Sequence, residues 1–297
     1  RPDAMDLPSV FKPKMMRASM KKPQTEQIVE KIRELVSPSE DIEEVYEGMS
    51  RRNRAECGIM DLGGLEKDFR EGKGILKKED IKETYIKRIL GSIKLNKNLN
   101  ISIDCGNGAA GVVAKDVYER LGCNVIELYG ELDGSFPNHH PDPGNPNNLI
   151  DIAKMVVSEK ADLGMAFDGD GDRLGLIDEN GKLIFPDKIM MLFARDLLKS
   201  YEGGKVIFDV KCSSKLTEVI EENGGEAIMT PTGHFHIKNS LKETMAMVAG
   251  EMSGHIFFND YWYGFDDAHY AGFRLLEIIK KNNRPLSKLM EEFPTTC

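Results

Sequence analysis

The chain has 297 residues, of which 40% are hydrophobic and 30% charged, and its formal net charge is −9 at pH 7. That length exceeds what one hydrophobic core usually organises, so more than one domain is expected. The composition excludes a disordered chain, and the acidic balance argues against nucleic acid as a partner.

The first predicted element is a helix over residues 25–36, in which apolar residues recur at helical spacing and Thr25 can cap the N-terminus. Residues 37–78 are charged and contain several glycines, which predicts irregular connections and one or two short strands. A second amphipathic helix follows from Ile81 and ends before Leu95. We place a domain boundary near residue 80.

Beyond residue 80 the predicted strands alternate with helices. Strands are expected at 99–104, 124–129, 163–167 and 174–178, with helices at 112–121 and 149–160 and a loop at 133–148. A second run has helices at 187–199, 214–222, 266–280 and 286–292, strands at 206–210, 226–229 and 247–250, and a loop at 230–238. This alternation predicts an α/β fold of two successive, similar domains over residues 81–183 and 184–297, each with a mixed sheet flanked by helices.

Cysteine spacing and hydropathy indicate the compartment. The five cysteines are widely spaced and include no C-x-x-C motif, which fits a reducing environment. No apolar run approaches the ~20 residues that a membrane-spanning helix requires. We therefore expect a soluble, cytoplasmic protein that does not bind membranes.

The clearest motif is the hexapeptide DGDGDR at residues 168–173, directly after a predicted apolar strand. Asp168, Asp170 and Asp172 alternate with glycines, so the chain can turn tightly and direct three carboxylates at one hard cation. The alternative is a polar turn of solvated aspartates. An EF-hand calcium loop is unsuitable, because Arg173 occupies the position that requires glycine and the flanks are strands. Mg²⁺ is preferred, with phosphate oxygens as further ligands.

Arg173 follows the three aspartates directly. Its guanidinium can stabilise a phosphoryl group during transfer, or it can neutralise surplus carboxylate charge. Both roles are compatible.

A second glycine motif, GNGAAG at residues 106–111, matches the dinucleotide-binding pattern G-x-G-x-x-G. It follows a strand, precedes a helix, and has Glu127 about 20 residues further on, where a ribose-binding acid would stand. An oxidoreductase is therefore an alternative function. The competing interpretation is a tight turn whose glycines let helix and sheet approach closely, and this one is favoured because no second half of a dinucleotide fold is evident.

Two polar loops follow strands of the second run. GEMSGH at 250–255 combines a carboxylate, a hydroxyl and an imidazole, which suit neighbouring sugar hydroxyls, although such a loop alone can be merely structural. TPTGHFHIK at 230–238 and Lys211 also stand at strand ends, where ligands collect in open α/β sheets. Lys211, His234 and Lys238 are thus predicted to converge on one anion.

Taken in order, these loops resemble the α-D-phosphohexomutase family, which includes the phosphomannomutases and phosphoglucomutases. The resemblance extends from about residue 10 to residue 293 and rests on many ordered motifs. They are DCGNGAAG at 104–111, FPNHHPDPGNP at 136–146, DGDGDR at 168–173, DVKCS at 209–213, TGHFHIK at 232–238, GEMSGH at 250–255 and WYGFDD at 262–267. The resemblance favours the packing-turn interpretation of the glycine motif.

The resemblance implies a four-domain enzyme that transfers phosphate between the 1- and 6-positions of a hexose phosphate through a phosphoserine and a bisphosphorylated intermediate. It assigns Mg²⁺ to Asp168, Asp170 and Asp172, and places Arg173, Lys211 and Lys12 near the transfer. Glu251 and Ser253 would bind sugar hydroxyls. The substrate set is completed by Gly233, His234, Lys211 and His255, some of which are candidates for proton transfer.

The N-terminal region departs from the family pattern. The family's serine-histidine-asparagine-proline loop precedes a stretch that resembles Val10-Phe11-Lys12, but RPDAMDLPS stands upstream here. We therefore interpret residues 1–80 as the remnant of a first domain without the phosphoserine loop, with the fourth domain absent. We expect this chain to be incomplete or inactive alone. A non-catalytic protein that binds phosphosugar and metal is the alternative, and the choice among mannose, glucose and aminosugar stays open.

Overall fold

The computed structural model describes residues 78–93, 95 and 98–295. The predicted helix at 25–36, the irregular segment that follows it and Lys12 lie outside these residues. Within the described residues no helix is both long enough and apolar enough to span a membrane. Cys105, Cys123 and Cys212 are buried free thiols.

The first sheet has five strands in the order β2-β1-β3-β4-β5. Strand β1 (Asn100–Asp104) is central and pairs in parallel with β2 (Asn124–Leu128) and β3 (Leu163–Phe167). Strands β4 (Leu174–Asp178) and β5 (Leu183–Ile184) continue the sheet in antiparallel register. All five residues of β3 and all five of β4 are buried, as expected for strands covered on both faces.

Helix α5 (Ile150–Glu159) covers one face of this sheet. Its buried residues Ile152 and Val156 stand four positions apart and therefore share one side of the helix. A Cβ atom on Gly164 of β3 would lie 2.7 Å from Val156, so glycine is what lets the helix approach the strand closely. The other helical segments of this half are α3 (Lys82–Ser92), η2 (Ala109–Val112), α4 (Ala114–Arg120) and η3 (Pro146–Leu149).

The second sheet has four strands in the order β7-β6-β8-β9. Strand β6 (Lys205–Asp209) is parallel to β7 (Glu226–Thr230) and to β8 (Val248–Gly250), and β9 (Ile256–Phe258) is antiparallel to β8. The order and directions repeat those of β2-β1-β3-β4. Helix α8 (His234–Thr244) covers one face through Ile237 and Leu241, as α5 does in the first sheet.

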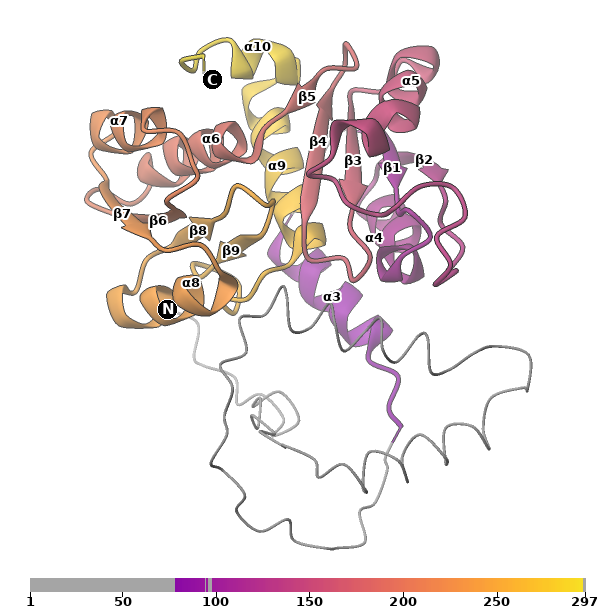
Figure 1. Cartoon of the computed structure of the whole chain (residues 1–297), viewed down its shortest axis with the longest axis horizontal. Coiled ribbons are helices and arrows are strands. Elements are labelled where there is room, and N and C mark those ends of the chain that lie inside the picture. The colour runs from indigo at the N-terminus through magenta and orange to yellow at the C-terminus, as the bar shows by residue number, and fades with distance from the viewer. Residues whose placement is uncertain (1–77, 94, 96–97, 296–297) are drawn as a thin grey trace, which may run out of the picture. The chain divides into compact units, whose positions relative to one another are not determined.

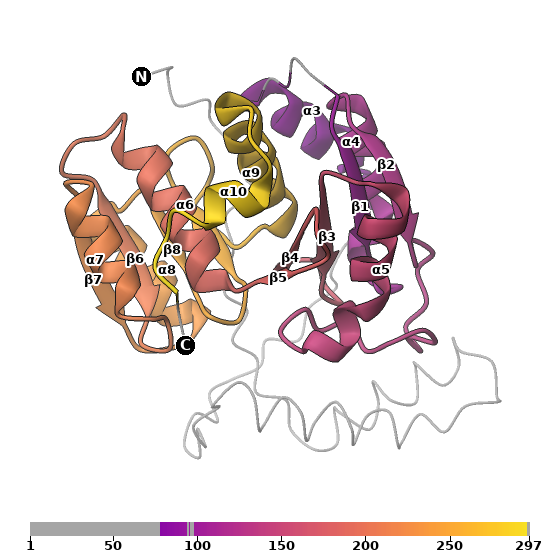
Figure 2. The same cartoon turned by 90° about the horizontal axis from the view of Figure 1, so that it is seen from above.

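Helix α9 (Ala268–Asn282) lies between the two sheets and contacts both β4 and β9 (Figures 1 and 2). It begins where the Asp267 side chain accepts a hydrogen bond from the Tyr270 amide. One continuous hydrophobic core includes residues of both sheets and of α9, such as Met165, Phe208 and Phe273. The remaining helices are α6 (Pro186–Leu198), α7 (Lys215–Glu222) and α10 (Leu286–Met290).

The predicted fold class is confirmed, since two mixed sheets are flanked by helices. One local prediction was wrong, and two short strands were missed. Residues 230–238 were expected to form a loop, but helix α8 already starts at His234. The strands β5 and β9 were not predicted. The division into domains at residues 183 and 184 stays a prediction.

Candidate functional site

The carboxylate loop, residues 168–173, joins β3 to β4. Asp168 is 1% exposed, and its Oδ1 accepts backbone N–H groups of Gly171, Asp172 and Arg173 at 3.0–3.1 Å. Its Oδ2 accepts the Arg173 Nε–H at 2.6 Å. Burial alone would raise the pKa of Asp168, but the hydrogen bonds from Arg173 outweigh it and leave that pKa lowered. Asp168 therefore stays ionised and holds the loop closed around itself.

The three loop aspartates present a donor set that fits a hard cation. Asp168, Asp170 and Asp172 each offer an oxygen within 4.8 Å of the others. Burial, followed by the charges of Asp168 and Asp172, raises the pKa of Asp170 to about 6. The loop thus holds several carboxylate charges close together, and Arg173 alone does not neutralise them all. Oxygen-only ligands at this spacing suit Mg²⁺.

Arg173 links the carboxylate loop to a second loop that sequence reasoning did not assign. Its Nη1 donates to Asp142 Oδ1 at 3.0 Å, while its Nε binds Asp168. Asp142 lies in the Pro/Asn-rich segment between β2 and α5. Its position between two prolines in the PDPGNP motif was the available signal, but spacing alone does not show which charge it meets. In this arrangement Arg173 neutralises carboxylate charge, one of its two predicted roles.

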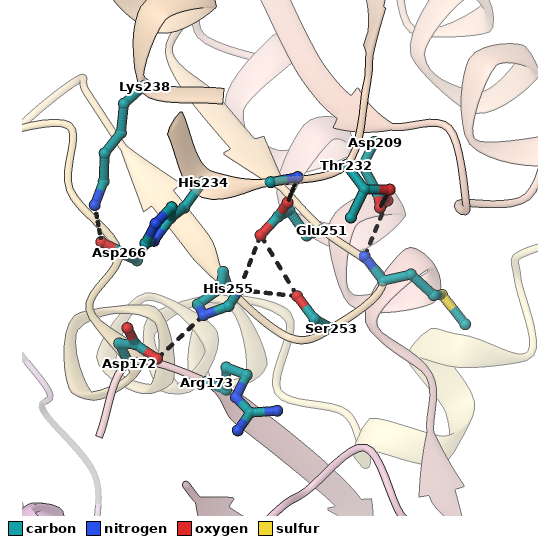
Figure 3. A network of polar contacts seen from close by, with 12 residues as sticks. Asp172, Arg173, Asp209, Thr232, His234, Lys238, Glu251, Ser253, His255 and Asp266 are labelled. Carbon is teal, nitrogen blue, oxygen red and sulfur yellow. Dashed lines mark hydrogen bonds and ion pairs between the residues drawn. The ribbon is translucent and has the colours of Figure 1, made fainter. Parts of the chain in front are cut away.

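The loop at residues 251–255 joins β8 to β9 and is organised around a buried carboxylate (Figure 3). Glu251 is 2% exposed and accepts the Gly233 N–H at 2.6 Å. Its Oε2 lies 2.8 Å from His255 Nδ1, and the Ser253 hydroxyl lies 2.8 Å from the same nitrogen. The predicted residues Gly233, Glu251, Ser253 and His255 are thus brought together in one hydrogen-bonded group.

The two loops meet directly. Arg173 and His255 form an isolated antiparallel β-bridge, in which the Leu174 N–H donates to the Gly254 carbonyl at 3.1 Å. His255 Nε2 lies 3.2 Å from Asp172 Oδ1, as Figure 3 shows. Burial lowers the pKa of His255, but hydrogen bonds to Asp172 and then to Glu251 outweigh it and raise that pKa to about 9. Without a bound cation the imidazole is therefore protonated at neutral pH and can donate a proton.

Asp209, at the end of β6, supports the loop at residues 251–255 through hydrogen bonds. It was not predicted as a site residue. It is fully buried and accepts the Met252 N–H at 3.1 Å and the Thr232 hydroxyl at 2.8 Å (Figure 3). It therefore ties together the segments that carry Glu251 and Gly233. A charged residue closing an apolar strand was the available signal, since a buried carboxylate needs partners.

Lys211, His234 and Lys238 were predicted to converge on one anion. In the structure His234 and Lys238 lie near the same carboxylate, that of Asp266. Lys238 Nζ lies 2.7 Å from Asp266 Oδ1, and His234 Nδ1 lies 3.7 Å from Asp266 Oδ2. The rings of His234 and His255 are 6.1 Å apart. Lys211 is exposed in the turn after β6, and within the described residues no hydrogen bond or ion pair joins it to the other two.

The glycine turn at 106–111 is packed against the carboxylate loop. Its amides are already used, since Gly106 N donates to Asp104 Oδ1, Asn107 N to the Tyr129 carbonyl and Gly108 N to the Cys105 carbonyl. A Cβ atom on Gly108 would lie 2.8 Å from the Gly169 carbonyl, whose oxygen accepts the Ala109 N–H. A dinucleotide pyrophosphate needs free amides and open space at this turn. The geometry therefore contradicts the oxidoreductase alternative.

Fold and site together define an α/β protein in which a loop of three carboxylates, a donor set that suits a hard cation, adjoins a loop that groups a carboxylate, a hydroxyl and an imidazole. Comparison with known families matches residues 83–181 to domain II and residues 185–297 to domain III of the phosphoglucomutase/phosphomannomutase family, both described as alpha/beta/alpha domains. The chain belongs to this family, as the sequence motifs predicted.

The relatives show the same relationship. The chain is 51% identical over 227 residues to a phosphomannomutase/phosphoglucomutase of Pseudomonas putida, covering 76% of this chain and 49% of that protein. It is 50% identical over 236 residues to a phosphoglucomutase of Neisseria gonorrhoeae, covering 78% and 51%. A crystal structure of a family protein from Burkholderia thailandensis matches with TM-score 0.75 and 43% identity over 84% of this chain and 52% of that one. The chain spans about half the length of the curated relatives it matches.

Proposed function

We propose that this chain supplies the metal-binding and sugar-binding halves of a Mg²⁺-dependent phosphohexomutase. That enzyme would transfer phosphate between the 1- and 6-positions of a hexose phosphate. The relatives named phosphomannomutase/phosphoglucomutase and phosphoglucomutase support glucose or mannose phosphates as the substrate class.

The observation that carries the proposal is the direct contact between the two loops. A cation held by Asp168, Asp170 and Asp172 would stand beside the group formed by Glu251, Ser253 and His255, since Asp172 and His255 are 3.2 Å apart. Phosphoryl transfer depends mainly on positioning and on stabilisation of charge, and this arrangement offers both at one place.

Each residue group has a separate role in the proposed reaction. Asp168, Asp170 and Asp172 would hold Mg²⁺, whose charge would stabilise the phosphoryl oxygens when it is bound. Arg173 would exchange its contact with Asp142 for the phosphoryl group, while Ser253 and Glu251 orient sugar hydroxyls. His255 would donate or accept the hydroxyl proton, and Lys211 and His234, both exposed, would bind the distal phosphate. Lys12 lies outside the described residues, and its role near the transfer stays a prediction.

Calorimetry of Mg²⁺ binding, paired with a mutase assay, tests the proposal. Asp170→Ala is expected to abolish measurable Mg²⁺ binding, because it removes one of three ligands and leaves the fold intact at a position that is itself exposed. Asp151→Ala, on the exposed side of α5, is the matched control and should bind Mg²⁺ like the wild type. Unchanged Mg²⁺ affinity in Asp170→Ala would contradict the metal assignment.

The assay must also separate an enzyme from a binding protein. Glucose 1-phosphate and mannose 1-phosphate are supplied with a hexose bisphosphate as phosphoryl donor, and intact mass reveals a phosphorylated serine. Turnover that Asp170→Ala abolishes supports a mutase. Binding of the sugar phosphate without turnover or phosphoserine, measured on the full-length protein, would favour the non-catalytic alternative.

A further inference from the structure

We propose that Asp172, His255 and Asp266 form a second divalent-cation site beside the carboxylate loop, and that this site takes a cation of the Zn²⁺ class. The three residues come from three different segments: the β3–β4 loop, the β8–β9 hairpin and the segment before α9. Because the fold brings them together from separate elements, the site is not simply a run of neighbouring acidic residues.

The spacing of the three side chains suits one cation. Each is half-buried and offers a ligand atom within 4.8 Å of the others. His255 Nε2 and Asp172 Oδ1 are 3.2 Å apart. Two ligands of one tetrahedral zinc stand about 3.3 Å apart when the bonds are about 2.0 Å long. A small inward movement of Asp266 would complete three protein ligands and leave a position open.

Asp266 gives an independent indication that something is bound here. Its side chain is only 7% exposed, and its Oδ1 pairs with Lys238 Nζ at 2.7 Å. Its Oδ2 is buried without a hydrogen-bond donor among the described residues, since His234 Nδ1 is 3.7 Å away. A buried carboxylate oxygen without a partner is costly. A cation between Asp172 and Asp266 would satisfy it.

His255 is held as a metal-ligating histidine usually is. Its Nδ1 lies 2.8 Å from Glu251 Oε2, and Glu251 is fixed in turn by the Gly233 N–H at 2.6 Å. A carboxylate on one ring nitrogen orients the ring and leaves the other nitrogen for the ion. An imidazole nitrogen selects Zn²⁺ over Mg²⁺, whereas the oxygen-only set of Asp168, Asp170 and Asp172 selects Mg²⁺.

The two sites share Asp172, so they are adjacent. Zn²⁺ would bind Nε2 of His255, the residue to which the proposed function assigns proton transfer. Zn²⁺ is therefore expected to inhibit the enzyme without displacing Mg²⁺. That consequence rests on the proposed function, whereas the binding of Zn²⁺ does not.

Zn²⁺ titration by calorimetry in the presence of saturating Mg²⁺ tests the site on the whole protein. The wild type should bind one Zn²⁺. His255→Gln and Asp266→Asn should weaken Zn²⁺ binding at least about 10-fold and leave Mg²⁺ binding unchanged. Asp170→Ala should show the reverse pattern, losing Mg²⁺ and keeping Zn²⁺.

His236→Gln is the matched control, because His236 is exposed on α8 and belongs to neither site. It should bind Zn²⁺ like the wild type. Retained Mg²⁺ affinity shows that each Zn²⁺-site variant is folded. Unchanged Zn²⁺ affinity in His255→Gln, or equal loss of Zn²⁺ in Asp170→Ala and His255→Gln, would overturn the proposal. The first result would place Zn²⁺ elsewhere, and the second would place it in the carboxylate trio.

Discussion

The two sheets share one strand plan and differ in the chemistry placed on it. In both, three parallel strands are followed by an antiparallel one, and the loop after the third parallel strand carries the candidate functional residues. That loop holds three carboxylates in the first sheet and Glu251, Ser253 and His255 in the second. The topology thus places the candidate site residues at the same loop of each sheet, and the side chains in that loop differ between the sheets.

The first strands of the two sheets sharpen the comparison, since each ends on a buried aspartate. Asp104 accepts the Gly106 N–H and contacts His139, in the loop after β2. Asp209 accepts the Thr232 hydroxyl from the loop after β7, and also reaches Met252 in the ligand loop itself. In the second sheet the carboxylate of Asp209 therefore supports two segments that carry candidate site residues, the one with Gly233 and the one with Glu251.

The largest expected effect follows from removing that carboxylate. Asp209→Ala leaves buried donors without acceptors and should lower the free energy of unfolding by about 4 kcal/mol. It should also weaken glucose 1-phosphate binding while Mg²⁺ affinity changes little. Urea unfolding and calorimetry measure the two quantities.

Asp104→Ala is the matched variant in the first sheet. It should affect Mg²⁺ more than the sugar phosphate, because the turn it supports packs on the carboxylate loop through the Ala109 N–H and the Gly169 carbonyl. If the two variants change the Mg²⁺ affinity and the glucose 1-phosphate affinity in the same proportion, the first sheet does not specifically support Mg²⁺ binding, nor the second sugar-phosphate binding.

Two glycines test how tightly each half is packed. A Cβ atom on Gly111 would lie 2.1 Å from the backbone carbonyl of Gly130, whereas one on Gly250 would lie 2.4 Å from the flexible side chain of Met190. Gly111→Ala should therefore cost about 3 kcal/mol of stability and Gly250→Ala about 1 kcal/mol. Chemical denaturation of both variants measures the free energy of unfolding. Equal losses of stability would show that the backbone at Gly130 moves aside as easily as the Met190 side chain.

The helix between the sheets provides a prediction about pH. His269 is buried against Phe167, neither ring nitrogen has a hydrogen-bond partner among the described residues, and burial lowers its pKa to about 4. The unfolded chain binds this proton near pH 6.5, so the native state loses stability as the pH falls from 6.5 toward 4. His269→Phe removes that loss, and its stability relative to the wild type should rise by about 2 kcal/mol between pH 7 and pH 5.

The difference between variant and wild type is the quantity to measure by denaturation at each pH. Burial raises the pKa of Asp267 to about 6, so this group titrates in the same range with the opposite slope. A difference that does not change with pH would mean that the pKa of His269 is the same in the folded protein as in the unfolded chain.

The smallest expected effect concerns the contact between α3 and the segment before α9. Arg88 lies over the rings of Trp262 and Tyr263 and donates to the Tyr261 carbonyl at 2.9 Å. Arg88→Ala should lower the free energy of unfolding by about 1 kcal/mol, since the site is exposed. Arg88→Lys keeps the charge and should recover part of this loss, and a thermal melt with no change in either variant would show that the contact contributes nothing.

Sequence reasoning reached the strand plan but missed elements with little apolar pattern. Strand β3 is an apolar run, LGMAF, and β1 alternates apolar and polar residues, NISID; both are typical strand patterns. Helix α8 buries few side chains, chiefly Ile237 and Leu241, and its N-cap residue and first three residues read GHFH, which looks like a polar loop. Strand β9 has three residues, too few to show any period. Short elements of this kind are fixed by pairing with neighbours rather than by their own composition.

The same limit applies to the candidate site. The motifs pointed to Asp168, Asp170, Asp172, Glu251 and His255, because each stands in a short pattern with a chemical meaning. The partners Asp142, Asp209 and Asp266 also lie in family motifs, but those motifs do not show which groups they meet, and their roles follow from contacts between segments far apart in the chain. Such contacts depend on how the two sheets are placed together.

The bridge between Arg173 and His255 has a mechanical consequence. A backbone hydrogen bond from the Leu174 N–H to the Gly254 carbonyl joins the β3–β4 hairpin to the β8–β9 hairpin. The loop of three aspartates and the loop that carries His255 are therefore joined through their backbones as well as through the side chains of Asp172 and His255. A change in the position of either loop would be passed directly to the other.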